Sequence, residues 1–127
     1  MSKRVCILGA GRQGTAAGYD LMRFLPDCDL TFADIDIKQA VRASERIEKL
    51  LGKKTSSVQI DLMNSSELSD FLLPFDIFLS SVPYKFNIYL TDIAINTKTS
   101  MVDLYRNNIN HGFHFFGVCR IYIHTKQ

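Results

Sequence analysis

The stretch Val5-Cys6-Ile7-Leu8-Gly9-Ala10-Gly11-Arg12-Gln13-Gly14 decides the fold of this chain. It reads as a short apolar strand, a glycine-rich turn and the start of a helix. The glycines follow the pattern G-x-G-x-x-G. Gly9 permits a tight turn out of the strand, Gly11 lets a pyrophosphate approach the backbone, and Gly14 lets the helix pack close to the strand. The unpaired N–H groups at the start of that helix suit the phosphates of a dinucleotide.

An acidic residue follows the next predicted strand. Leu30-Thr31-Phe32-Ala33 reads as that strand, and Asp34 ends it, 20 residues beyond Gly14. A carboxylate there accepts hydrogen bonds from the adenosine ribose hydroxyls and repels a 2′-phosphate, which favours NAD over NADP. The alternative is that Asp34 and Asp36 only cap the next helix.

Neighbouring residues complete the candidate adenosine and pyrophosphate contacts. Arg12 and Gln13 lie in the phosphate turn, and Ile35 follows Asp34. Arg12 could meet a pyrophosphate or a 2′-phosphate, so NADP stays an alternative cofactor. It could also be simply solvated.

Composition limits the classes of protein to consider. The 127 residues allow one domain with a core, and 46% hydrophobic with 22% charged residues is typical of a soluble globular chain. A net charge of +2 does not indicate nucleic-acid binding. Three cysteines at unrelated spacings predict neither a disulfide framework nor a zinc site, so we expect a reducing cytoplasm. No apolar run is long enough to span a membrane, and the N-terminus lacks a signal-peptide core.

Hydrophobic periodicity predicts strands and helices in strict alternation after the first strand. We expect helices near 12–25, 37–51, 64–73 and 85–96, and strands near 29–33, 57–60, 75–79 and 100–104. Such alternation predicts a Rossmann-type, doubly wound parallel sheet in a three-layer αβα domain over residues 1–104. Asn64 and Glu67 are expected to form a capping box.

The periodicity also predicts which side chains face the sheet. For the first helix they are Ala16, Ala17, Leu21, Phe24 and Leu25. For the second they are Ile37, Ala40, Val41, Ser44, Ile47 and Leu50.

Two further strand ends should contribute to the ligand crevice, which lies at the carboxyl ends of parallel strands. Asp61 and Leu62 follow the third strand and are expected near the adenine, although Asp61 reads almost equally well as a turn residue. Ser81, Val82 and Pro83 follow the fourth strand and should face the nicotinamide half of the cofactor.

Residues 105–127 differ in composition from the rest of the chain. All 13 acidic residues lie at or before Asp103, and all three histidines (His111, His114 and His124) lie in this tail. Two histidines three residues apart, without a third ligand, make a poor metal site, so no metal is expected. Residues 115–123 could form a sixth strand. The tail could equally be the remnant of a larger substrate domain, or sequence from a shifted reading frame.

With these segments in place, the chain resembles the nucleotide-binding domain of the saccharopine dehydrogenase and lysine 6-dehydrogenase family over residues 3–104. The resemblance rests on Val5 to Gly14, on residues 31–36, on Ser81-Val82-Pro83-Tyr84-Lys85-Phe86-Asn87, and on Met101-Val102-Asp103-Leu104. The last two segments are the more specific ones.

The resemblance implies a cytoplasmic amino-acid oxidoreductase that transfers a hydride between a nicotinamide and a carbon–nitrogen bond, at lysine or at a secondary amine such as saccharopine. The matching cofactor positions are Gly9, Gly11, Gly14, Asp34, Ser81, Val82 and Pro83. The family continues into a long substrate and dimerisation domain, whereas here Tyr105-Arg106-Asn107-Asn108 follows the fifth strand. We therefore name no catalytic residue and expect an amino-acid substrate only with a further domain.

The main alternative is a free-standing nucleotide-sensing module, like the regulatory domains of potassium transporters. Those domains usually carry a Gly-Asp-Ala-like turn after the third strand, where this chain has Ile60-Asp61-Leu62-Met63, and they lack the segment Val82 to Asn87. A methyltransferase using S-adenosylmethionine is disfavoured by the complete three-glycine spacing. An exposed surface on the last helix or strand would favour a homodimer.

Overall fold

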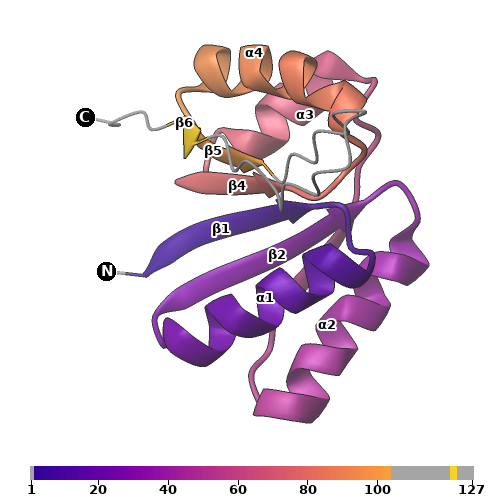
Figure 1. Cartoon of the computed structure of the whole chain (residues 1–127), viewed down its shortest axis with the longest axis vertical. Coiled ribbons are helices and arrows are strands. Elements are labelled where there is room, and N and C mark those ends of the chain that lie inside the picture. The colour runs from indigo at the N-terminus through magenta and orange to yellow at the C-terminus, as the bar shows by residue number, and fades with distance from the viewer. Residues whose placement is uncertain (1, 104–120, 123–127) are drawn as a thin grey trace, which may run out of the picture.

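A computed structural model of the chain describes residues 2–103 and 121–122 (Figure 1). The elements in chain order are β1 (Lys3–Leu8), α1 (Arg12–Phe24), β2 (Cys28–Asp34), α2 (Ile37–Leu51), β3 (Ser56–Gln59), α3 (Ser65–Leu72), β4 (Ile77–Ser80), the 3-10 turn η1 (Tyr84–Phe86), α4 (Asn87–Thr97), β5 (Ser100–Asp103) and β6 (Ile121–Tyr122). The strand order is β3-β2-β1-β4-β5-β6. Strands β1 to β5 are parallel, so the predicted doubly wound Rossmann-type sheet is confirmed.

The sheet separates two helical layers (Figure 1). Helices α1 and α2 cover β1, β2 and β3 on one face, where Ile7, Leu30 and Phe32 are buried. Helices α3 and α4 cover the other face, where Leu8 and Phe78 are buried. The chain crosses from one face of the sheet to the other between β3 and β4. The strand order therefore reverses between the neighbouring strands β1 and β4, and the connections that follow these two strands lead away to opposite faces of the sheet. That point is where open α/β sheets bind ligands.

The predicted inner face of α1 is correct only in part. Ala17 and Leu21 are partly buried and pack against the core of this layer as expected. The residues of α1 that are buried are Gly14, Gly18 and Met22, whereas Phe24 is 67% exposed and Ala16 is also exposed. A Cβ atom on Gly18 would lie 2.4 Å from Cζ of Phe32, so the glycine surface lets the helix lie directly on β2. A glycine adds nothing to a hydrophobic pattern, and the periodicity therefore did not include Gly18 in the predicted face.

The inner face of α2 is predicted only in part. Ala40 and Ile47 are buried as expected, and Ala43 is buried with them. Leu50 is 53% exposed, since it lies in the last turn of the helix, beside the C-cap Gly52. The helix ends where predicted because Gly52 takes the left-handed conformation (φ 66°) that glycine tolerates.

Several boundaries differ from the predicted ones. Strand β4 begins at Ile77 rather than at residue 75, because Asp76 instead exchanges two hydrogen bonds with Arg4: its N–H donates to the Arg4 carbonyl and its carboxylate accepts from the Arg4 N–H, both at 2.9 Å. The last predicted helix begins with the η1 turn before α4. Asn64 caps α3 as expected: its Oδ1 accepts from the Glu67 N–H at 3.2 Å. The Glu67 carboxylate returns to the Asn64 side-chain amide and not to its backbone N–H.

Most of the tail lies outside the described residues. The predictions made for it, including the histidine pair His111 and His114, therefore stay predictions. Within the described residues, β6 pairs antiparallel with β5, with Tyr122 opposite Met101 and Ile121 opposite Val102.

Candidate functional site

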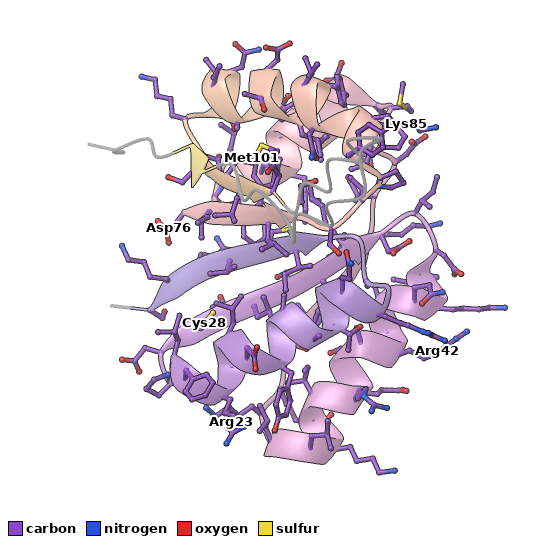
Figure 2. The ribbon with its side chains drawn as sticks, in the orientation of Figure 1. Arg23, Cys28, Arg42, Asp76, Lys85 and Met101 are labelled. Carbon is purple, nitrogen blue, oxygen red and sulfur yellow. The ribbon has the colours of Figure 1, made fainter. Side chains whose placement is uncertain are left out.

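A cleft of about 290 Å³ lies at the carboxyl edge of the sheet. Figure 2 shows this edge on the side of the labelled Lys85, opposite the edge where Asp76 precedes β4. From the residues predicted for the site, the cleft gathers Gly9, Gly11, Asp34, Ile35, Asp61, Leu62, Ser81, Val82 and Pro83. These residues lie at the ends of β1, β2, β3 and β4 or in the loops that follow them, so four segments far apart in the sequence meet at the cleft.

The other predicted residues lie beside this cleft. Gln13 is exposed in the first turn of α1, Gly14 is buried beneath the glycine turn, and Arg12 lines a separate groove between α1 and α2. The sequence analysis missed four residues that line the cleft, which are Ala33, Ile60, Met63 and Phe86. Ala33, Ile60 and Met63 directly adjoin predicted residues in the chain, so proximity to Asp34, Asp61 and Leu62 was the available signal.

Gly9 is required by both conformation and space. Its φ is +94°, a value that other residues rarely adopt. A Cβ atom there would also lie 2.7 Å from the Ser81 carbonyl oxygen. The turn out of β1 therefore packs directly against the backbone that follows β4, and the two walls of the cleft are in contact at Gly9.

Gly11 and Gly14 differ in what surrounds them. A Cβ atom on Gly14 would lie 2.0 Å from the Gly9 carbonyl oxygen, so α1 can begin beneath the turn only with glycine at this position. A Cβ atom on Gly11 would meet nothing within 4 Å. Packing of the protein therefore explains Gly9 and Gly14, whereas Gly11 leaves open space above the backbone.

The first turn of α1 presents positive potential to this space. Gly11 is the N-cap and supplies no side-chain hydrogen bond, and no acidic residue lies in the first turn. The leading N–H groups of a helix lack intrahelical partners and carry partial positive charge. An anionic group above Gly11 would therefore be stabilised by the backbone of α1.

Asp34 joins the second strand to the glycine turn. Its Oδ2 accepts a hydrogen bond from the Ala10 N–H at 2.8 Å, and its Oδ1 accepts one from the Asp36 N–H at 2.9 Å. The side chain of Asp36, in turn, caps α2 by accepting from the Lys38 N–H. Of the two aspartates, Asp36 alone is the N-cap, whereas the half-buried Asp34 lines the cleft.

The loop after β3 is held by its own hydrogen bonds. The Asp61 carboxylate accepts from the Met63 N–H at 3.0 Å, which is the turn role that the sequence also allowed. The Leu62 carbonyl accepts from the Tyr89 hydroxyl of α4 at 2.7 Å. These bonds place Leu62 and Met63 along the apolar wall of the cleft.

A buried pair fixes the loop after β4. The Ser80 hydroxyl donates to Oδ1 of Asn87 at 2.8 Å, and both residues are buried. This bond closes residues 81–86 into a short loop between β4 and α4, with Ser81, Val82 and Pro83 on the cleft.

Among the described residues, no group of three His, Cys, Asp or Glu side chains is arranged to hold a metal ion.

This combination of a glycine turn, an acidic end of β2 and a Val-Pro-Tyr loop after β4 agrees with a match to a known protein family. Residues 5–114 match the family described as the saccharopine dehydrogenase NADP binding domain. The chain belongs to this family.

Solved structures share the fold of this saccharopine dehydrogenase-type domain. Apo saccharopine dehydrogenase (L-Glu forming) from Saccharomyces cerevisiae is 24% identical, with a TM-score of 0.70 over 84% of this chain and 23% of that chain. Quinate dehydrogenase from Corynebacterium glutamicum in complex with NAD is 24% identical, with a TM-score of 0.53 over 65% of this chain and 28% of that chain.

A UDP-glucose-4-epimerase from Stenotrophomonas maltophila with bound NAD is 16% identical, with a TM-score of 0.67 over 87% of this chain and 40% of that chain. At these identities the likeness concerns the fold. The chain spans under a quarter of the length of the yeast saccharopine dehydrogenase. In the part of the chain that the structure describes, no helix is long and apolar enough to cross a membrane.

Proposed function

We propose that the chain binds a nicotinamide dinucleotide in the cleft at the carboxyl edge of the sheet, with NAD favoured over NADP. The observation that carries the proposal is the hydrogen bond that holds Asp34 against the glycine turn. The hydrogen bond from Ala10 holds the carboxylate beside a turn whose central glycine leaves open space. A ribose beside Asp34 would place its attached pyrophosphate over Gly11 and the start of α1.

Each wall of the cleft has a distinct part in this proposal. Backbone N–H groups after Gly11 hold the pyrophosphate, with Arg12 and Gln13 beside it, and Asp34 accepts from the ribose hydroxyls next to Ile35. Leu62 contacts the adenine with Asp61 nearby. Ser81, Val82 and Pro83 face the nicotinamide half. When it is bound, the cofactor supplies hydride chemistry, and this chain supplies orientation.

In its wider role, the chain serves as the cofactor domain of an amino-acid oxidoreductase that acts at a carbon–nitrogen bond. Family membership supports this role. The groups that bind the amino acid come from a further domain, since the chain corresponds to under a quarter of the yeast enzyme. The location that we propose for the chain is the cytoplasm, as its resemblance to this family implies.

The experiment is a calorimetric titration of the purified chain with NADH and with NADPH, repeated with Gly11→Asp. The wild-type chain should bind NADH. The variant should not, because a carboxylate on Gly11 occupies the space proposed for the pyrophosphate and repels it. The variant should still fold, since a Cβ atom at this position meets nothing within 4 Å.

The matched control adds the same charge away from the cleft, as Ser66→Asp in the exposed first turn of α3. It should bind NADH as the wild type does, and circular dichroism should show native folding for both variants. Undiminished NADH affinity in a folded Gly11→Asp chain would refute a pyrophosphate site at the glycine turn.

A further inference from the structure

The loop that forms the apolar wall of the cleft is attached to the rest of the fold at few points. Residues 61–63 lie between β3 and α3, and Leu62 and Met63 line the cleft. The Asp61 carboxylate accepts from the Met63 N–H, so this bond stays within the loop. Among the described residues, one hydrogen bond ties residues 61–63 to a distant part of the chain. Its donor is the Tyr89 hydroxyl, 2.7 Å from the Leu62 carbonyl oxygen.

Tyr89 itself lies outside the cleft. It belongs to the first turn of α4, and it packs against the same hydrophobic core as Leu62. The residues that line the cleft do not include Tyr89, whereas they do include Leu62. The Tyr89 side chain can therefore influence a ligand in the cleft only through the position of the Leu62 backbone.

The start of α4 is in turn attached to the sheet. The Ser80 hydroxyl, at the end of β4, donates to Oδ1 of Asn87, the first residue of α4. Among the described residues, the buried Nδ2 of Asn87 has no hydrogen-bond partner, so this side chain holds α4 to β4 through a single bond. In Figure 2 the labelled Lys85, in η1, marks this end of α4. Strand β4, helix α4 and the loop after β3 are thus connected in series.

We propose that Tyr89 is a positioning residue for the adenine half of the dinucleotide site. This inference rests on the proposed function, in which Leu62 contacts the adenine. A hydrogen bond from a fixed helix narrows the range of positions that a loop samples. Without the hydroxyl, the loop occupies the binding position for a smaller fraction of the time, and the apparent affinity falls by that fraction.

The test replaces Tyr89 with phenylalanine, which removes the hydroxyl and keeps the ring in the core. We expect the affinities for NADH, ADP-ribose and AMP to fall by a common factor of about threefold to tenfold, the usual range for one hydrogen bond. Reduced nicotinamide mononucleotide lacks the adenine and should bind as it does to the wild-type chain. Calorimetric titration measures all four ligands. A general loss of folding would weaken all four alike, so this comparison separates positioning from stability.

Tyr19→Phe is the matched control. It removes a tyrosine hydroxyl from α1, in the other helical layer, where that hydroxyl donates to no described residue. It should leave all four affinities unchanged. Hydrogen exchange supplies a second measurement that needs no ligand. The Met63 N–H, which is bonded within the loop, should exchange faster in Tyr89→Phe, whereas the N–H groups of β4 should exchange as in the wild type.

The outcomes separate this inference from the proposed function. If the wild-type chain binds neither NADH nor NADPH, the dinucleotide site itself is wrong, and the inference fails with it. If NADH binds and Tyr89→Phe keeps the wild-type affinities, the dinucleotide site stands and Tyr89 does not position it. An equal loss for reduced nicotinamide mononucleotide would also overturn the inference, because the effect would then extend beyond the adenine half. Unchanged exchange at Met63 would show that Tyr89 does not hold the loop.

Discussion

At the scale of single residues, Asp34 is suited to two tasks, of which the sequence analysis considered ribose binding but not support of the glycine turn. It ends β2 as a candidate ribose acceptor, and it also holds the glycine turn through the Ala10 N–H. A carboxylate has about four lone-pair sites, so the two backbone hydrogen bonds leave room for further donors. Ribose binding and support of the turn are therefore compatible in one side chain.

Replacing Asp34 with serine tests both tasks. The affinity for NADPH should rise relative to that for NADH, because the negative charge that opposes a 2′-phosphate is gone. The free energy of unfolding should fall by about 1–3 kcal/mol, since N–H groups of Ala10 and Asp36 lose their acceptor. Calorimetric titration and urea denaturation measure the two effects.

Asp34→Asn is the control, because it keeps the shape of the side chain and one acceptor oxygen while it removes the charge. It should change the cofactor ratio in the same direction with a smaller loss of stability. If neither variant changes the ratio, Asp34 supports the turn and takes no part in cofactor choice.

At the scale of elements, helix α1 is defined by how closely it approaches the sheet. Gly14 contacts the glycine turn, and Gly18, one turn later, faces the ring of Phe32. Beside these two glycines the large side chains of the interface come from the strands, and Met22 adds a large side chain from the helix one turn further on. Because α1 lies so close to the sheet, its N-terminus is placed against the cleft. The glycines that let the helix pack closely therefore also set the geometry of the proposed phosphate site.

Gly18→Ala should lower the free energy of unfolding by about 1–3 kcal/mol, the usual range for overpacking a core. The reason is that the new Cβ atom would lie 2.4 Å from Cζ of Phe32, and the helix would have to move. Chemical denaturation measures the loss.

A double-mutant cycle with Phe32→Leu provides the control, because leucine lacks the ring atoms that the new methyl group meets. The two substitutions should be less destabilising together than the sum of their separate effects. Strict additivity would show that Gly18 matters for some reason other than contact with Phe32.

At the scale of the whole molecule, both helical layers close over the central strand β1. Cys6, in the middle of this strand, is 0% exposed and belongs to the core under α3 and α4. Burial raises the pKa of the Cys6 thiol far above its ordinary value. The pKa of the Cys28 thiol is raised as well, by burial and then by the negative charge of Asp29. Neither thiol should be reactive in the native fold.

Alkylation by iodoacetamide, read by peptide mass spectrometry, should therefore reach Cys6 only after global unfolding. Stability should also fall as pH rises above about 8.5, the ordinary thiol pKa, because the unfolded chain can ionise Cys6 while the folded chain keeps it neutral. Below that pH the thiol is neutral in both states and contributes no slope.

Cys6→Ala should make the free energy of unfolding fall less steeply with pH above about 8.5. The smaller side chain of alanine should lower the free energy of unfolding by a similar amount at every pH, so this loss does not affect the slope. Rapid labelling of Cys6 under conditions where the chain is folded would contradict the closed two-layer core around β1.

Much of this architecture was predictable because its signals are local. Alternating apolar runs of strand and helix length predicted the order of the elements, and Gly52 and Asn64 marked helix ends that the structure confirms. In the sheet-facing stripe of α1, the close approach at Gly14 was predicted from the glycine motif, whereas the one at Gly18 was not. Gly18 is defined by its contact with Phe32, and hydrophobic periodicity does not register a missing side chain.

The sequence by itself determined the fold class, the glycine turn and the acidic end of β2, because each depends on residues that are neighbours in the chain. Tertiary structure alone decided that Asp34 meets Ala10, that Gly9 packs on Ser81, and that arginines 30 residues apart share one groove. Those relations depend on the distance between layers and on the register of strands. Both are set by long-range packing, and no local pattern encodes them.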